Sequence, residues 1–235
     1  YTVEGYYATG KNVASVVVVY EDDSLVEVDA LSPTAIITNI TDKSNPDNSD
    51  YSKQLSLFVF GRGAVSGVTE NRWAEASAVR DFVVGDVIQY TLTSEDYINS
   101  DTVELAYGVT GAMETVDKTR STAGITTQIV SGLLYDADGT RIYLAKKNNM
   151  DDMADVAIAD AESYGVDGNA RVFMYDATKS GTERVVDLEN TADPVYDLGN
   201  LHQYIDYADA AVKRADELFV YRYEAAVRFI YIVRR

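Results

Sequence analysis

The chain reads Val83-Val84-Gly85-Asp86-Val87-Ile88-Gln89-Tyr90-Thr91-Leu92 at its most informative point. The Gly-Asp pair is typical of a turn, and apolar and polar side chains alternate after it. A turn that leads into such a run is a strand-entry signal of small β-barrels. The stretch therefore predicts a β module, and no other part of the sequence indicates catalysis with comparable strength.

The composition favours an ordered globular protein. The chain has 235 residues, which suffice for one large or two small cores, and 46% of them are hydrophobic while only 3 are Pro. Its 38 acidic and 20 basic residues give a formal net charge of -18. Because this charge repels phosphates and anionic headgroups, we expect no nucleic-acid partner. We interpret the acidic residues as a solvated surface, with cation binding as the lesser alternative.

No apolar run reaches the roughly 18 residues needed to span a bilayer, so we expect no membrane insertion of this segment. The sequence starts at Tyr1 without a leader, and we interpret it as a processed or excised part of a longer protein.

We expect a mostly β fold of two small antiparallel barrel or sandwich modules in tandem. The first module covers residues 1–115, and its residues 1–20 form a hairpin that resembles the end of a module. Residues 111–124 are small, polar and charged, which is typical of a linker between modules. The strands expected here are Thr2–Tyr7, Val13–Tyr20, Ala35–Thr41, Lys53–Phe60, a run beginning at Asp86, and Thr102–Tyr107.

The second module covers residues 116–235. Its clearest hairpin turns at Asp136–Gly139. A short helix is expected near residues 198–215, where Leu201, Ile205, Ala208 and Val212 recur at helical spacing. The strands expected in this module are Thr127–Tyr135, Thr140–Ala145, Ala170–Tyr175, Glu183–Leu188, Glu217–Tyr223 and Ala226–Val233. The last two echo the first hairpin of the chain, which suggests a tandem array.

The motifs that could carry chemistry are weak. The segment Gly5–Asn12 approaches a phosphate-binding loop, but Asn12 replaces the required hydroxyl and a strand follows, so a plain turn is favoured. The segment Asp136–Gly139 approaches a calcium loop, yet Lys147 stands at the twelfth position, where such a loop needs Glu. The glycines of Gly61-Arg62-Gly63 fit a hairpin tip better than a dinucleotide site.

The chain has no Cys and one His, His202, which we interpret as a surface or capping residue. We therefore expect no catalytic residues, no cofactor and no metal site. A glycan hydrolase with two carboxylates stays open as a minor alternative. Trp73, Tyr221 and Tyr223 are possible glycan contacts, and the alternative is that these rings cover a core or a seam between modules.

Three parts of the chain resemble tandem β modules that follow S-layer homology repeats in exported surface proteins of Gram-positive, Clostridia-like bacteria. These parts are Ile36–Thr41 with the hairpin into Leu55–Val59, the strand entry Val84–Tyr90, and the closing hairpin Leu218–Val233.

The resemblance implies a non-catalytic structural or interaction segment that is extracellular and associated with the cell wall. Its partners would be cell-wall components or neighbouring modules of the same polypeptide, and the modules would contact each other little. The alternative is a carbohydrate-binding module of the cell envelope.

Overall fold

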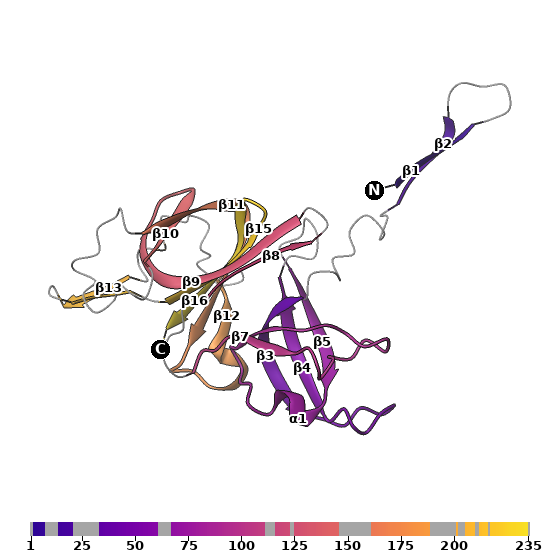
Figure 1. Ribbon diagram of the computed structural model, residues 1–235, viewed down its shortest axis with the longest axis horizontal. Coiled ribbons are helices and arrows are strands. Elements are labelled where there is room, and N and C mark those ends of the chain that lie inside the picture. The colour runs from indigo at the N-terminus through magenta and orange to yellow at the C-terminus, as the bar shows by residue number, and fades with distance from the viewer. Residues whose placement is uncertain are drawn as a thin grey trace.

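The computed structural model describes residues 2–7, 14–20, 33–60, 67–110, 116–122, 125–145, 161–188, 201, 205–209, 212–215 and 217–234. Within these ranges the chain is mostly β, as predicted. A five-stranded antiparallel sheet lies against a closed five-stranded mixed barrel, and Figure 1 shows the sheet below and to the right of the barrel.

The sheet confirms the predicted hairpin and the predicted strand entry. In spatial order its strands are β5 (Val68–Ala74), β4 (Lys53–Val59), β3 (Thr34–Asp42), β6 (Val87–Gln89) and β7 (Glu104–Tyr107). Strand β5 was not predicted, because this edge strand is polar and lacks the apolar alternation that marks a half-buried strand. The short helix α1 (Ala76–Val79) follows it.

Alternation along β3 and β4 divides the apolar side chains of the sheet between two cores. Ala35 and Ile37 point to one face and Ile36 points to the other, as expected for successive residues of a strand. The core on the first face also contains Val79 from α1 and Ile98 from the chain after β6. The sheet is therefore covered on both faces, by the barrel on one side and by α1 and the chain after β6 on the other.

The barrel is a closed ring of five strands, and each strand of the ring pairs with the strand on either side of it. Going round the ring, these are β9 (Ile125–Ala137), β10 (Arg141–Ala145), β11 (Glu162–Asp176), β16 (Ala226–Arg234) and β15 (Glu217–Tyr223). Two further strands pair with members of the ring: β8 (Asp117–Thr122) with β9, and β12 (Val185–Asp187) with β11. The 3-10 turn η4 (Gly181–Arg184) precedes β12.

One barrel pair departs from the antiparallel arrangement that the sequence predicted. Strands β11 and β16 are parallel, with Val172 opposite Ile230. Parallel strands need a long connection, and residues 177–225 provide it. The barrel is therefore mixed.

Side-chain size differs between the inside and the outside of the barrel. In β15, Leu218 and Val220 belong to the inner cluster, whereas Phe219 and Tyr221 point outward to the sheet. The inner cluster is almost wholly aliphatic, since a ring of five strands leaves little interior space. Its buried members are Val130, Leu134, Ile142, Leu144, Tyr164, Val172, Leu188, Leu201, Leu218, Val220, Val227, Ile230 and Ile232.

The outward aromatic side chains form one core with the facing side of the sheet, which we call the seam core. The rings of Phe60 and Phe229 stack with their centroids 3.9 Å apart, and those of Phe58 and Phe173 lie 4.4 Å apart. The expectation of little contact between the modules is therefore wrong. The buried members of the seam core are Ile36, Phe58, Phe60, Val87, Ala106, Tyr107, Val109, Val116, Ile129, Phe173, Tyr175, Phe219, Tyr221, Phe229, Tyr231 and Val233.

The predicted Gly85-Asp86 turn lies at the centre of this contact. Gly85 has φ +105°, and a Cβ added there would lie 2.5 Å from the Tyr175 ring. The buried Tyr231 hydroxyl donates to the Gly85 carbonyl oxygen at 2.9 Å. Burial raises the pKa of Tyr231 well above its usual value, which keeps this donor protonated. The turn is therefore in direct contact with the barrel.

Asp86 organises the backbone around the turn. Its carboxylate oxygens accept hydrogen bonds from the backbone N–H groups of Val83 at 2.9 Å and Val109 at 3.0 Å. Burial raises the pKa of this carboxyl, and the two hydrogen bonds act in the opposite direction. Asp86 thereby fixes the start of β6 relative to the end of β7.

The helix predicted near residues 198–215 is wrong for the described residues. Residues Ile205–Asp209 and Val212–Ala215 form the antiparallel strands β13 and β14. Four apolar positions at helical spacing are a weak signal, and pairing between the strands satisfies backbone groups that a helix would otherwise satisfy internally.

Part of the predicted linker is also a strand, because Asp117–Thr122 pairs with β9 as β8. The hairpin predicted within residues 1–20 is confirmed as β1 (Thr2–Tyr7) and β2 (Ala14–Tyr20). The module boundary between residues 115 and 116 stays a prediction.

Substitution of Gly85 tests the close contact at the turn. We expect Gly85→Ala to lower the free energy of unfolding by about 3 kcal/mol. The new Cβ would clash with the Tyr175 ring, and alanine is also strained at the positive φ of this position. Gly181→Ala is the matched control, since Gly181 has φ +55° with open space around it, and about 1–2 kcal/mol is expected. Urea denaturation of both variants measures the difference. Equal losses would contradict a close contact at Gly85.

The seam core predicts that the sheet and the barrel unfold together. Phe229→Ala removes a buried barrel ring, which should cost about 3–5 kcal/mol. Trp73, the single tryptophan, lies on β5 of the sheet, so its fluorescence reports on the sheet alone. We expect the substitution to shift the Trp73 transition and the far-UV circular dichroism transition equally. Leu105→Ala, at a 46% exposed position, is the control. A Trp73 transition unchanged in Phe229→Ala would show that the two parts unfold independently.

Candidate functional site

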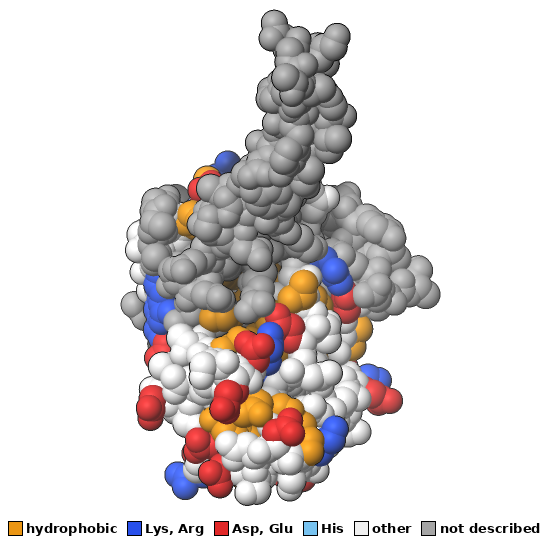
Figure 2. All heavy atoms as spheres, turned by 90° about the vertical axis from the view of Figure 1, so that its right-hand side faces the viewer, with side chains coloured by type: hydrophobic (Ala, Val, Ile, Leu, Met, Phe, Trp, Pro, Cys, Tyr) orange, Lys and Arg blue, Asp and Glu red, His pale blue; other side chains and the backbone are white. Residues whose placement is uncertain are grey.

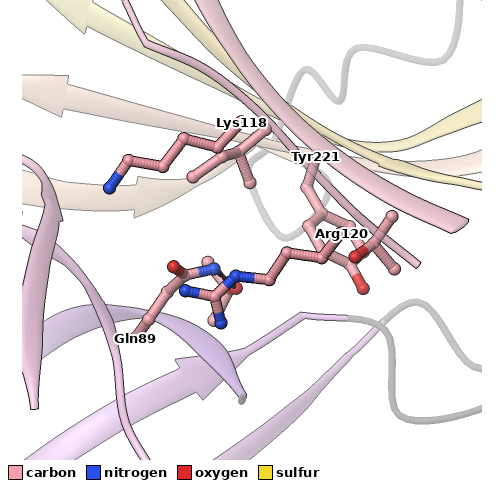
Figure 3. A pocket seen from close by; sticks show the side chains of 7 residues that line it. Gln89, Lys118, Arg120 and Tyr221 are labelled. Carbon is pink, nitrogen blue, oxygen red and sulfur yellow. Dashed lines mark hydrogen bonds between the residues drawn. The ribbon is translucent and has the colours of Figure 1, made fainter. Parts of the chain in front are cut away.

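A small pocket opens where the sheet meets the barrel, and we call it the seam pocket (Figure 3). Two strands of the sheet contribute Thr34 and Gln89, and the barrel contributes the rest. The lining residues are Thr34, Gln89, Lys118, Arg120, Thr127, Ile129 and Tyr221. The pocket holds about one water molecule.

Strand pairing brings these residues together. On the barrel side, Lys118 lies opposite Ile129, which in turn lies opposite Tyr221. Arg120 lies opposite Thr127 in the next row of the same face. Because residues two apart on a strand share a face, Lys118 and Arg120 point to the same side of β8. The barrel wall of the pocket is thus made of two cross-strand rows.

The sheet side supplies a buried amide. Gln89 is 5% exposed, and its Nε2 donates to Thr34 Oγ1 at 3.0 Å. Its Oε1 has no hydrogen-bond partner among the described residues. A buried acceptor without a partner is costly, and a water molecule is one donor that could satisfy it.

The charge of the pocket is positive in a chain that is acidic overall. Arg120 pairs with Glu104 at 3.1 Å, and both side chains are exposed by more than a third. Lys118 makes no ion pair within the described part of the chain. Burial, followed by the neighbouring Tyr223, raises the pKa of Tyr221 to about 12, so this phenol adds no negative charge at neutral pH. The lining thus carries two cationic side chains, of which Arg120 is already paired with Glu104.

A second surface of interest surrounds Trp73 and belongs to the sheet alone. Asn39, Ser56 and Asn71 lie opposite one another across β3, β4 and β5. The next row along the strands is Thr41, Gln54 and Trp73. We call these two rows the Trp73 face. All six residues are half-buried or exposed and none is charged, so the face offers an indole ring among amides and hydroxyls.

Hydrogen bonds and one cation order this face. Ser56 Oγ donates to Asn71 Oδ1 at 2.7 Å, and Asn39 Nδ2 donates to Thr41 Oγ1 at 3.3 Å. The Lys43 ammonium lies 5.4 Å from the centroid of the Trp73 ring. An exposed cation–π contact of this kind is worth only about 0.5–1 kcal/mol, so a ligand can displace it.

The structure separates the three aromatic residues predicted as glycan contacts. Trp73 lies on β5, whereas Tyr221 and Tyr223 lie on β15. Tyr221 is 6% exposed and belongs to the seam core, and Tyr223 packs against that core. Trp73 is therefore the one of the three that lies on the sheet, away from the seam core, and their assignment as contacts stays a prediction.

Sequence reasoning did not find the seam pocket. Lys118 and Arg120 were assigned to a linker, and in a linker a spacing of two residues does not place side chains on one face. The alternation of basic and hydroxyl residues in Asp117–Thr122 was the available signal for a strand with a basic face. Nothing in the sequence indicated that Gln89 would face them.

Other chemical candidates receive no support. Within the described ranges, no group of three His, Cys, Asp or Glu side chains could hold a metal ion. In the turn after β9, Asp138 Oδ1 accepts hydrogen bonds from the backbone of Thr140 and Arg141, which lower its pKa and confirm a structural turn. His202, residues 8–13 and Gly61-Arg62-Gly63 lie outside the described residues.

No helix in the described ranges is long and apolar enough to cross a membrane. Comparison of the chain with protein-family models, with curated proteins and with solved structures found no match. The two surfaces described above therefore carry the functional argument, and the resemblance to S-layer-associated modules stays a prediction.

Proposed function

We propose that this chain is a non-catalytic structural and interaction segment of an exported bacterial cell-surface protein, located outside the cell and associated with the wall. The seam core is the observation that supports a structural role. It joins the sheet and the barrel through stacked rings such as Phe60 and Phe229, so the unit resists bending between its parts.

The surface charge agrees with this role. On the face shown in Figure 2, acidic and basic side chains are scattered over the described surface, between uncharged groups and several patches of hydrophobic side chains. A net charge of -18 keeps such units soluble and apart at high local concentration. Wall components and neighbouring modules of the same polypeptide are the proposed partners.

Retention on cell-wall material tests the interaction role. The purified chain is incubated with isolated wall polysaccharide and with peptidoglycan, each with and without calcium, and the bound fraction is measured against chain concentration. Saturable retention in either material supports an interaction segment. If the chain binds neither material, with calcium or without it, wall association is contradicted and only a structural role is left.

The second candidate is a carbohydrate-binding module, and the Trp73 face favours it. An indole ring can stack on the apolar side of a sugar ring, while the flanking Gln54, Asn71 and Thr41 can exchange hydrogen bonds with sugar hydroxyls. Because the two rows carry no charge, neutral glycans are the expected ligands.

A glycan array tests this candidate with the intact chain and two variants. We expect Trp73→Ala to weaken binding about tenfold or more, because a central aromatic anchor often dominates a small interface. Tyr143→Ala, at a half-buried tyrosine on β10 of the barrel, is the matched control and should bind like the intact chain. Equal binding by the two variants would exclude Trp73 from any glycan site.

A further inference from the structure

We propose that the hairpin β1–β2 closes the β-barrel of a neighbouring module, in the way that β15–β16 closes the barrel of this chain. The partner is a barrel of the same kind that lacks a closing hairpin of its own and belongs to the same polypeptide. This inference rests on the proposed function, which names neighbouring modules as partners. In Figure 1 the hairpin stands apart from the sheet and the barrel, and among the described strands β1 and β2 pair only with each other.

The pairing of β15 with β16 provides the template. Five consecutive pairs begin with Glu217 opposite Val233 and end with Tyr221 opposite Phe229. The second strand then bulges, and Arg228 is the extra residue. Within the barrel, β15 is antiparallel to β9 and β16 is parallel to β11, so this hairpin fills the space between two strands.

The pairing of β1 with β2 repeats this pattern. Five consecutive pairs begin with Thr2 opposite Tyr20 and end with Tyr6 opposite Val16. The second strand then bulges at the same place, and Ser15 is the extra residue. Because a bulge sets the local twist and register, two hairpins with the same bulge present their edges in the same way. The strands β1 and β2 therefore correspond to β15 and β16 position by position.

The residues at equivalent positions also agree in size. Within the five pairs, the positions of β15–β16 that belong to the inner cluster hold Leu218, Val220, Ile230 and Ile232. The equivalent positions of β1–β2 hold Val3, Gly5, Val17 and Val19. Each is aliphatic or glycine, as the interior of a five-stranded ring requires. Tyr6 stands at the position of Tyr221, which points outward.

The apolar run of β2 calls for cover on both faces. Val16–Tyr20 are five consecutive apolar residues, and the equivalent run Phe229–Val233 is wholly buried between the inner cluster and the seam core. A two-stranded ribbon cannot bury both of its faces, and an isolated hairpin is only marginally stable. An open barrel supplies what is missing, because it offers one strand to β1 and another to β2 and encloses the inner face.

Other partners satisfy less of the hairpin. A second copy of this chain has a barrel that is already closed, and removal of its own hairpin would expose the rings of Phe219 and Phe229. A single strand edge would pair with one side of the hairpin and leave the apolar faces of β2 in water. An open barrel of the same kind occupies both edges and covers the inner face.

The test is a fusion that offers the intact chain an open barrel. Residues 33–215 of a second copy are joined directly to Tyr1, which places Thr2 where Glu217 follows in that copy. Hydrogen–deuterium exchange then follows the backbone amides of β1 and β2. We expect these amides to exchange roughly a hundredfold or more slowly in the fusion than in the intact chain, because they join a closed sheet.

A second fusion shows whether the added barrel can accept a hairpin. Three outward positions differ, since β1–β2 has Glu4, Val16 and Val18 where β15–β16 has Phe219, Phe229 and Tyr231. Glu4→Phe, Val16→Phe and Val18→Tyr restore these rings for the added sheet to cover. Rapid exchange of the unsubstituted hairpin beside protection of the substituted one would overturn the proposal. Rapid exchange of both would overturn the register on which it rests.

A matched pair of variants at equivalent positions completes the test in the intact chain. We expect Ile230→Asp to abolish cooperative unfolding, because it places a charge in the inner cluster. Val17→Asp should leave the Tm of the intact chain unchanged and remove the protection of β1 and β2 in the fusion.

Two results in the intact chain would assign the hairpin to a different partner and overturn the proposal. A lower Tm for Val17→Asp would mean that the hairpin packs on the barrel or sheet of its own chain. Protection of β1 and β2 that rises with chain concentration would mean that it binds a second copy. None of these measurements uses wall material, so their failure is distinct from a failure of wall retention.

Discussion

The contact between the Gly85-Asp86 turn and the barrel is the constraint on which the rest of the structure depends. At this point Tyr175 lies where a side chain on residue 85 would stand, and the Tyr231 hydroxyl donates to the Gly85 carbonyl oxygen. The same turn continues the sheet, because Gly85 N–H donates to the Ile37 carbonyl oxygen at 2.8 Å. A single short turn therefore starts β6, borders β3 and contacts the barrel.

The sorting of side chains by size follows from this contact. A ring of five strands has room for aliphatic groups, so the larger rings lie on its outside and need another surface to cover them. The sheet provides that surface with Phe58 and Phe60. Neither part could bury these rings alone, which explains why the sheet and the barrel share one core. The seam pocket lies along the same contact.

The sequence predicted the strands with strong β patterns and failed where the pattern was polar. The hairpins β3–β4, β9–β10 and β15–β16 were found because β-branched and aromatic residues are dense there. Strands β5 and β8 are polar edges, and their identity depends on partners distant in sequence. Trp73 was recognised as a candidate contact from its residue type alone. The amide and hydroxyl rows beside it, and the position of Gln89 in one pocket with Lys118 and Arg120, depend on strand pairing and were not predicted.

The position of β16 in the barrel bears on the order of folding. This strand lies between β11 and β15, and it carries Phe229 and Tyr231 into the seam core. During synthesis, β9, β10 and β11 emerge well before residues 226–234, so the barrel stays open and the sheet is not fully covered until β16 is made. The donor to the Gly85 carbonyl oxygen, Tyr231, lies 146 residues later in the chain and is therefore made much later. Folding of this chain is therefore expected to be slow, with β11 and β15 exposed as strand edges until β16 emerges.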